Sequence, residues 1–393
     1  MIPENDRKYK SFRETYKYTT FSMITSFVYP NSKNIKHRLF GFGLITLTSL
    51  PVVIFISIDV VRYAMDGNIV EIIQQTNLLG PFLAILFKIL IQCYCNQHAF
   101  AIINEINRDY ALYNDMSAPY QAIADESIKS NLTYTDRGWF IAVASVVLVF
   151  PAMALARNMY CQLQGVNRKF MLHEVRIPFV ADDDRYKSPL YEIMFLYMVY
   201  ICFLYLIGFS GYDAFYGLST NHACLKMKIY CKMFEEAVKA DVNEVQSKIA
   251  EVIKEQNRLY RFVDIIQNTF SIWLGLILLA TMIQLCNIMY ILIDGAGFDF
   301  KYLIFCIGST LHIFLPCLYS AKLKDMSLET ATLIYCGGWE QIHRPVIRRM
   351  VQFIIARSQV PMEIVAFNIK VFDMELFVSI LQASYSVYTL LRS

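Results

Sequence analysis

The residue types that catalyse reactions or bind metals occur in this sequence, but they are not gathered into a working pattern. The six histidines are far apart and form no H-E-x-x-H pair, and neither a phosphate-binding glycine loop nor a G-x-S-x-G turn is present. The acidic run Asp182-Asp183-Asp184 lacks the alternation and the turn glycine of a calcium-binding loop. We interpret this run as solvated loop charge rather than a cation site. We therefore expect no catalytic residue, no cofactor and no metal.

Three charged side chains fall inside long apolar segments, where a charge is costly and is often functional. Asp59 and Lys88 lie near the ends of their segments, so snorkelling toward the membrane surface explains them as well as a functional role does. Arg157 either snorkels too or offers a hydrogen-bond donor to a pocket. The elements that hold these residues are therefore expected to cross a membrane.

The composition supports that expectation. Of the 393 residues, 56% are hydrophobic and only 18% are charged, which is too apolar for an ordinary soluble domain. The net charge of +3 is too small to indicate binding to nucleic acid. The ten cysteines form no C-x-x-C pair and are interpreted as small buried side chains. We predict an all-α membrane protein of several spans.

Seven segments are long enough to span the bilayer core of about 30 Å, for which about 20 apolar residues suffice. They are approximately Leu39–Val61, Ile72–Cys95, Trp139–Tyr160, Leu190–Tyr212, Ile265–Ile293, Tyr302–Ala321 and Val371–Leu391. The loops on one side hold most of the 36 Lys and Arg residues, which is typical of the cytoplasmic side. We therefore predict seven transmembrane helices, with the N-terminus in the cytoplasm and the C-terminus outside the cell.

Two stretches outside these segments are amphipathic. The loop Met227–Arg261 has apolar residues at helical spacing and is predicted to be one cytoplasmic helix: Phe234, Val238, Val242, Val245, Ile249, Val252 and Leu259. A basic helix nearer the C-terminus carries Val346, Met350, Phe353 and Ile354. These helices either pack only on their own chain or form a cytoplasmic layer that binds other copies or a partner.

Several short motifs from about residue 170 onward form a familiar combination. They are Trp339, the ARSQVP run of Ala356–Pro361, the spacing of Glu375, Phe377 and Ser379, the closing Tyr388-Thr389-Leu390-Leu391, and Arg176-Ile177-Pro178-Phe179 in an outer loop. Together with the seven spans and the inverted orientation, this string resembles the insect odorant receptors from about residue 170 onward. The chain lacks the longer cytoplasmic loop of the family's co-receptor, so it resembles a ligand-specific tuning subunit.

The resemblance implies an assembly and a mechanism. Such receptors are tetrameric ligand-gated cation channels in the plasma membrane of olfactory neuron dendrites, in which tuning subunits assemble with the co-receptor. Residues 1–38 would be a cytoplasmic segment, 39–321 a six-helix ligand-binding region that includes the helix 227–261, 322–370 a cytoplasmic anchor, and 371–393 the pore-lining helix. Ser379, Ser384, Ser386 and Thr389 are expected to face water, with Leu390 and Leu391 closing the outer end of the pore. Packing between helices would also use Ser and Thr.

A volatile ligand requires an apolar cavity with few polar groups. Three helically spaced sets in the outer halves of the segments are candidates, and plain core packing is the alternative: Phe150, Met153, Arg157; Tyr191, Met194, Met198; Met282, Cys286, Met289. Four further candidates are chosen only by their depth: Leu79, Phe82, Tyr302 and Phe305. Methionine adapts to irregular shapes, which suits selectivity by shape. The other partner of the chain would be the lipid bilayer.

Two other functions compete with this interpretation. A gustatory-type receptor would form a homotetramer and conduct without a co-receptor. A seven-helix G-protein-coupled receptor is opposed by the charge asymmetry and by the absence of an N-P-x-x-Y-like motif in the last segment. A transporter would be expected to show two similar halves, and no such repeat is found.

Overall fold

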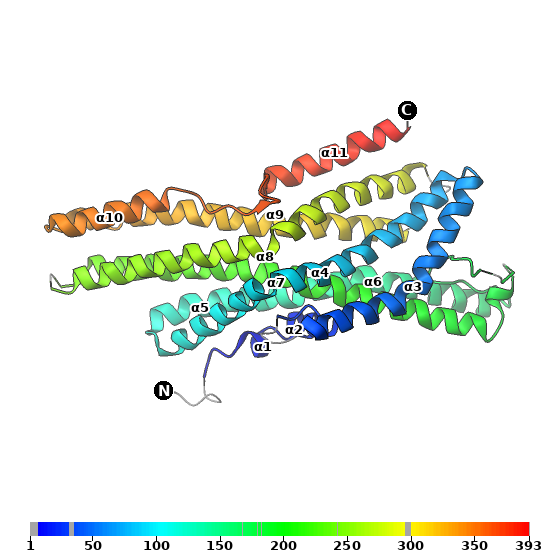
Figure 1. Ribbon diagram of the computed structural model, residues 1–393, viewed down its shortest axis with the longest axis horizontal. Helices are drawn as coiled ribbons and strands as arrows, with labels where there is room; N and C mark the ends of the chain where they lie inside the picture. Colours follow the sequence, from blue (N-terminus) through cyan, green and yellow to red (C-terminus); the bar gives the residue numbers. More distant parts are fainter. Residues whose placement is uncertain are drawn as a thin grey trace.

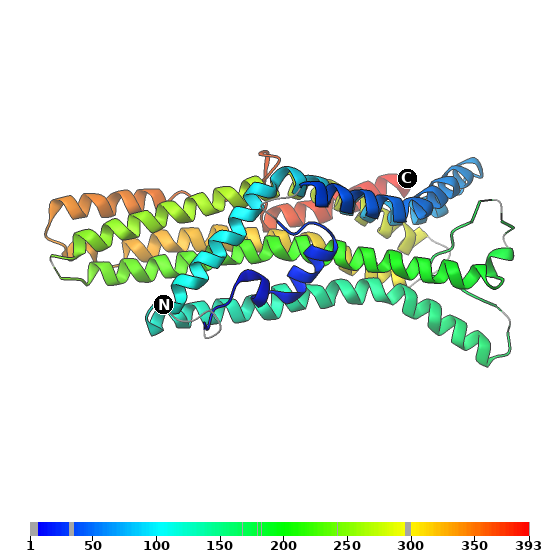
Figure 2. The same ribbon diagram turned by 60° about the horizontal axis from the view of Figure 1, so that its bottom comes forward.

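The protein is an elongated bundle of long helices that run side by side along one axis (Figures 1 and 2). The computed structural model describes residues 7–30, 35–166, 168–178, 180–181, 183–241, 243–294 and 300–392, without the side chains of 293, 294, 391 and 392. Asp182, Val242 and Phe179 therefore lie outside the described residues, as does the side chain of Leu391.

The helices and strands have the following bounds. They are α1 Phe12–Thr15, α2 Lys17–Thr25, α3 Ile35–Met65, α4 Ile69–Asp115, α5 Ala118–Ser130, the π-helical η2 Asn131–Gly138, α6 Trp139–Leu163, the 3₁₀ turn η3 Asp184–Tyr186, α7 Leu190–Val238, α8 Val245–Asp294, α9 Phe300–Tyr335, the 3₁₀ turn η4 Trp339–Gln341, α10 Pro345–Ser358, β1 Val365–Ala366, β2 Lys370–Val371 and α11 Met374–Arg392.

Within the described part of the chain, six helical stretches are long and apolar enough to cross a membrane. They contain the first six predicted segments, so the multi-pass membrane class is confirmed. The nineteen-residue α11 is not one of the six. The seventh span and the orientation of the termini therefore stay predictions.

Local signals explain where these helices turn. Between α3 and α4 the chain reverses at Gly67, whose φ of +70° is in the left-handed region that glycine adopts at little cost. Asn68 then caps α4, because its side-chain oxygen accepts a hydrogen bond from the backbone N–H of Glu71 at 3.3 Å. Pro345 begins α10 at a position that needs no N–H donor.

The stretch 227–261 differs from the single helix that its periodicity predicts. The helix α7 continues to Val238, the chain turns at Asp241, and α8 begins at Val245. The backbone carbonyl of Asp241 accepts hydrogen bonds from the N–H groups of Glu244 and Val245 at 2.8 and 3.0 Å. The apolar stripe is thus folded into a hairpin whose two arms are extensions of membrane helices.

The arms of this hairpin share a core with α9 and α10 at one end of the molecule (Figure 1). In α10 the buried apolar side chains are Ile347, Val351, Ile354 and Ile355. Of the predicted stripe only Ile354 is buried, whereas Val346 and Phe353 are 61% and 76% exposed. The helix is apolar on two sides, so its sequence did not indicate which side faces its own chain.

The N-terminal segment is a folded element packed on the bundle. Phe12 is fully buried, and the Tyr16 hydroxyl is 2.6 Å from that of Tyr110 in α4. The carboxylate of Asp136 accepts hydrogen bonds at 2.8 Å from both the N–H and the hydroxyl of Thr19. Residues 7–25 therefore contact both α4 and η2 and hold the two elements together.

The chain reaches its last helix through a small antiparallel hairpin in which Val365 pairs with Val371. Figure 1 shows α11 at the edge of the bundle, and it packs against α8 and α9. Leu376, Ile380, Ser384 and Tyr388 are its buried residues, at steps of four. Met374, Phe377, Leu381 and Ala383 are half-buried, and the other described side chains of α11 are exposed in the single chain.

Candidate functional site

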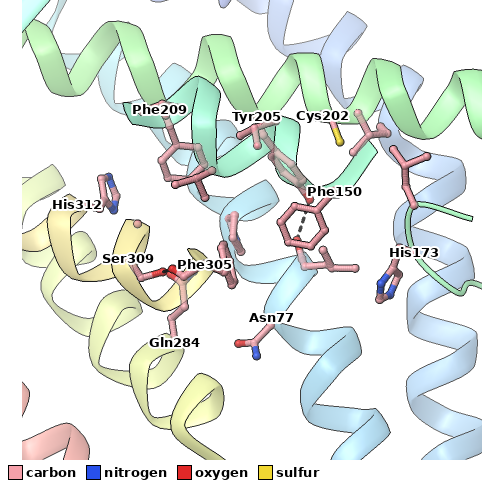
Figure 3. A pocket seen from close by; sticks show the side chains of 18 of the residues that line it. Asn77, Phe150, His173, Cys202, Tyr205, Phe209, Gln284, Phe305, Ser309 and His312 are labelled. Carbon is pink, nitrogen blue, oxygen red and sulfur yellow. Dashed lines mark hydrogen bonds between the residues drawn. The ribbon is translucent and has the colours of Figure 1, made fainter. Parts of the chain in front are cut away.

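A cavity of about 150 Å³ lies among the six long helices (Figure 3). Most of its lining is apolar or aromatic, as with Ile56 of α3, Phe150 of α6, Tyr205 of α7 and Phe305 of α9. The rings of Phe150 and Phe305 meet edge to face, with centroids 6.2 Å apart. Such a space suits a small, largely apolar molecule, since an apolar cavity of about 150 Å³ admits benzene.

The loop between α6 and α7 closes one end of this space. Leu172 and His173 of that loop line the cavity, and His173 Nε2 is 3.0 Å from Oε1 of Gln75 in α4. Burial, together with the charge of Lys301, lowers the pKa of His173 to about 3, so its imidazole is neutral at physiological pH. Among the described residues, the lining contains no Asp, Glu, Lys or Arg. A neutral ligand is therefore favoured.

A buried ion pair lies at the opposite end of the cavity. Lys88 Nζ donates hydrogen bonds to Asp213 Oδ2 at 2.8 Å and to the Gly208 carbonyl at 2.9 Å. Trp273 Nε1 donates to Asp213 Oδ1 at 3.1 Å, and His312 Nε2 is 3.0 Å from Asp213 Oδ2. His312 also lines the cavity and stacks on Trp139, with centroids 6.1 Å apart.

Lys88 therefore does not snorkel, because it is 1% exposed and fully partnered inside the bundle. Asp59 is also fully buried, and its carboxylate accepts a hydrogen bond from the backbone N–H of Arg176 at 2.8 Å. The snorkelling interpretation was wrong for both residues. Each charge has its partner on another element far away in sequence, which periodicity cannot reveal.

Four of the helices around the cavity contain a proline, and in three of them the carbonyl that loses its hydrogen-bond partner belongs to a residue that lines the cavity. Pro81, Pro151 and Pro316 lie inside α4, α6 and α9. A proline has no N–H to donate to the carbonyl four residues earlier. Those earlier residues are Asn77, Val147 and His312, and all three line the cavity. The helices thus weaken their own hydrogen-bond ladders where they surround this space.

The family described as 7tm odorant receptor matches this sequence over residues 68–385. This chain belongs to the odorant receptor family. The resemblance read from its C-terminal motifs is thereby confirmed, and because its relatives are receptors, the expectation that the chain is not an enzyme is confirmed as well.

Individual odorant receptors are similar over most of their length. Odorant receptor 10 of Aedes albopictus is 24% identical over 277 residues, which cover 69% of this chain and 72% of that one. Odorant receptor Or2 of Anopheles gambiae is 23% identical over 90% of this chain and 91% of its own.

The fold of this odorant receptor matches solved structures. The olfactory receptor OR5 of Machilis hrabei superposes with a TM-score of 0.69 at 16% identity, covering 96% of this chain and 97% of that one. A structure of the same receptor in complex with eugenol gives 0.70 at 14% identity, covering 96% and 99%.

Of the residues predicted to bind a ligand in this odorant receptor, three line the cavity. These are Phe150, Met198 and Phe305. The others are outside its lining: Leu79, Phe82, Met153, Arg157, Tyr191, Met194, Met282, Cys286, Met289 and Tyr302. Arg157, for example, is exposed, with its guanidinium 5.9 Å from the Phe170 ring centroid. The assignment of a ligand to any of these residues remains a prediction.

The cavity lies deeper than the helical sets predicted. Phe150 and Met198 are the innermost members of two of those sets, Phe305 was chosen by depth alone, and the lining continues inward from each of the three. On α4 the prediction missed Asn77, which precedes the predicted Leu79 and Phe82 along the helix. The deeper residues that it missed include Trp139, Val143, Tyr205, Phe209 and His312. Their three- and four-residue spacing was visible in the sequence. Their depth was not, because the outer loop that fills the mouth of the bundle carries no periodic signal.

Of the predicted pore residues that the structure describes in this odorant receptor, all but Ser384 lie on the uncovered side of α11. Ser386, Thr389 and Leu390 are exposed, whereas Ser384 is 1% exposed and points inward. The exposed side also has Glu375, Ser379 and Gln382. With Ser386 and Thr389 they form a stripe at alternating steps of four and three, which is one face of a helix. We call these five residues the polar stripe.

Proposed function

We propose that this odorant receptor is the ligand-binding subunit of a heterotetrameric, ligand-gated, non-selective cation channel in the plasma membrane of olfactory neuron dendrites. Its N-terminus is cytoplasmic, its C-terminus is extracellular, and α11 is the seventh span. The polar stripe carries this proposal. A helix that exposed such a stripe to lipid would leave a carboxylate and an amide without water. A water-filled pore between subunits removes that cost.

The uncovered face of α10 supports assembly at the other end of the molecule. Val346 and Phe353 are exposed there, opposite the side that packs on the chain's own core. Large exposed apolar side chains gathered on one helix mark interaction sites. We propose that this face binds the co-receptor subunit, so that the cytoplasmic helices hold the tetramer together around the last helices.

Ligand binding reaches the pore through α9. One face of this helix lines the cavity with Phe305, Ser309 and His312. Two residues beyond His312, the ring of Phe314 contacts that of Phe377 in α11, edge to face at 5.2 Å. A ligand that displaces α9 therefore moves the helix that carries the polar stripe. The cavity and the pore are thus coupled through the packed side chains of α9 and α11.

The test is the current from oocytes that express this chain with and without an insect odorant co-receptor, against a panel of volatiles and tastants. The proposal expects volatile-evoked current only when both chains are present. Current from this chain alone would contradict the heterotetramer and favour the gustatory-type homotetramer. Absence of current from the pair, although both chains reach the plasma membrane, would contradict the channel proposal itself.

A further inference from the structure

One polar side chain in the cavity has no partner within the protein. Asn77 of α4 is 4% exposed and lines the cavity, and in the described part of the chain neither its side-chain nitrogen nor its oxygen has a hydrogen-bond partner. Figure 3 shows its carboxamide projecting from α4 into the same space that Phe305 and Gln284 face. A buried amide without partners is costly, and native proteins usually satisfy both of its atoms.

Most of the other polar groups on the described residues around the cavity are already engaged, and Gln284 of α8, which also lines it, is only half-buried. The Tyr205 hydroxyl donates to the Leu78 carbonyl at 2.8 Å, and the Trp139 indole N–H donates to the Phe209 carbonyl at 3.0 Å. The Ser309 hydroxyl donates to its own helix at 2.9 Å. His312 is held by Asp213, as described above. Asn77 is therefore the fully buried group whose hydrogen-bonding capacity is available to a ligand.

We propose that Asn77 recognises the hydroxyl group of a small, uncharged alcohol or phenol, and that this contact sets the ligand class of the receptor. The inference deepens the proposed function, on which it rests. A hydroxyl accepts a hydrogen bond from the amide nitrogen and donates one to the amide oxygen, so it satisfies both atoms. An ether or a carbonyl satisfies only the nitrogen, and a hydrocarbon satisfies neither. The charge-free lining excludes ammonium and carboxylate ligands.

The backbone beside Asn77 reinforces this polarity. Pro81, one turn further along α4, has no N–H for the Asn77 carbonyl, so a second acceptor is released at the same residue. The remaining walls are apolar and aromatic, and the volume of about 150 Å³ limits the ligand to roughly six to ten heavy atoms. The predicted ligand is thus a ring-sized apolar body with one hydroxyl.

The chain offers a matched control on the same helix. Gln92 of α4 is also a buried amide, fully shielded from solvent, and neither of its side-chain atoms has a partner among the described residues. It does not line the cavity. Replacing either amide by leucine removes a buried unsatisfied group, but only Asn77→Leu changes the cavity.

The experiment compares probes that differ at one group: phenol, anisole and toluene, and benzyl alcohol with ethylbenzene. Wild type, Asn77→Leu and Gln92→Leu are each expressed with the co-receptor. Binding is measured as the probe-induced shift in the melting temperature of this chain in membranes, and opening is measured as current. Asn77→Ala repeats the comparison should leucine prevent folding.

In wild type and Gln92→Leu we expect the hydroxyl probes to act at roughly tenfold lower concentration than their methyl counterparts, the factor typical of a neutral hydrogen bond. In Asn77→Leu that ratio should fall to about one. Equal ratios in wild type and Asn77→Leu, or no stabilisation of wild type by any hydroxyl probe, would overturn the inference. A hydroxyl preference in melting that depends on Asn77, without current, would sustain it and overturn only the channel proposal.

Discussion

Lys88 and Asp213 form an ion pair inside the bundle, where removing one partner is far more damaging than removing both. Lys88→Met leaves the Asp213 carboxylate buried beside uncharged groups and should cost about 3–5 kcal/mol of stability. The measurement is the melting temperature of the detergent-solubilised receptor and the fraction that elutes as one species. We expect a large loss of folded protein.

The control for Lys88→Met is the double variant that combines Lys88→Met with Asp213→Asn. The asparagine keeps acceptors and donors for Trp273 and His312 but carries no charge. Most of the melting temperature should therefore return. A double variant as unstable as Lys88→Met would show that the methionine, rather than the unpaired charge, disrupts the site.

A second buried charge cluster, beyond the membrane spans, predicts the pH dependence. Although burial alone would raise the pKa of Asp109, the His222 hydrogen bond at 3.0 Å and Lys226 at 2.6 Å hold it well below its usual range. Burial lowers the pKa of His222. The Asp109 carboxylate acts in the opposite direction, but the nearby charge of Lys226 also lowers this pKa. Glu105 and Arg108 complete the cluster.

The sign of this dependence follows from the neutral form of His222. A histidine with a lowered pKa stabilises the fold fully above about pH 6.5, and that contribution is lost as the pH falls below this value. Asp109 adds acid sensitivity only below about pH 4. His222→Gln should keep the wild-type melting temperature at pH 8 and lose less of it at pH 5.5. The same change at the exposed His343 should leave the wild-type profile unaltered, and a His222→Gln profile parallel to wild type would contradict the assignment.

At the scale of elements, α2 and α7 approach backbone to backbone at Gly211. A Cβ there would lie 2.8 Å from the backbone nitrogen of Met23 and 3.0 Å from the carbonyl carbon of Ser22. Since backbone cannot move aside as a flexible side chain does, Gly211→Ala should cost about 1–3 kcal/mol. We expect a lower melting temperature and earlier proteolysis of the N-terminal segment.

Gly43 in α3 provides the comparison, because a Cβ added there meets nothing within 4 Å. Gly43→Ala should be neutral or stabilising, since alanine is the better helix former. Equal destabilisation by the two alanines would mean that the loss comes from the substitution in general and not from the contact between α2 and α7.

The elements themselves were largely predictable, but their ends and their partners were not. Six apolar segments gave six membrane-length helices, because mean hydropathy records immersion in lipid. Mean hydropathy did not predict that α4 continues to Asp115. In that extension the sequence is of mixed polarity, and Ile102, Ile106 and Tyr110 are buried on one face of the helix. Likewise α10 has two apolar faces, and only the packed structure shows that Ile347 faces inward and Phe353 outward.

The character of the cavity was predictable, but its depth in the bundle was not. Helical spacing identified Phe150 and Met198, depth alone identified Phe305, and the apolar, methionine-containing character of the walls was expected. Depth was assigned from the outer ends of the apolar segments, whereas Leu172 and His173 occupy that end. Whether the Asn77 side chain has a hydrogen-bond partner depends on how six helices pack together. No pattern within one segment could therefore predict that it has none.

At the scale of the whole molecule, the polar stripe predicts which residues meet water in the assembled channel. Gln382→Cys should make the current sensitive to a thiol-reactive methanethiosulfonate reagent, because this side chain is exposed on the stripe. Ser384→Cys is its matched control, two residues away and buried against α8 and α9. The measurement is the current of the heteromer before and after the reagent. Block at both positions, or at Ser384 alone, would contradict the placement of the pore.

The Lys88–Asp213 pair also has a consequence for how the chain is made. The two residues are 125 positions apart in sequence. At about 5–20 residues per second, the ribosome needs roughly 6–25 s to synthesise the aspartate after the lysine. During that interval α4 enters the membrane with a lone ammonium, which the insertion machinery tolerates at about 2.5–3.5 kcal/mol. Stable residence of α4 in the bilayer must therefore await α7, so the order of synthesis sets the order in which this receptor matures.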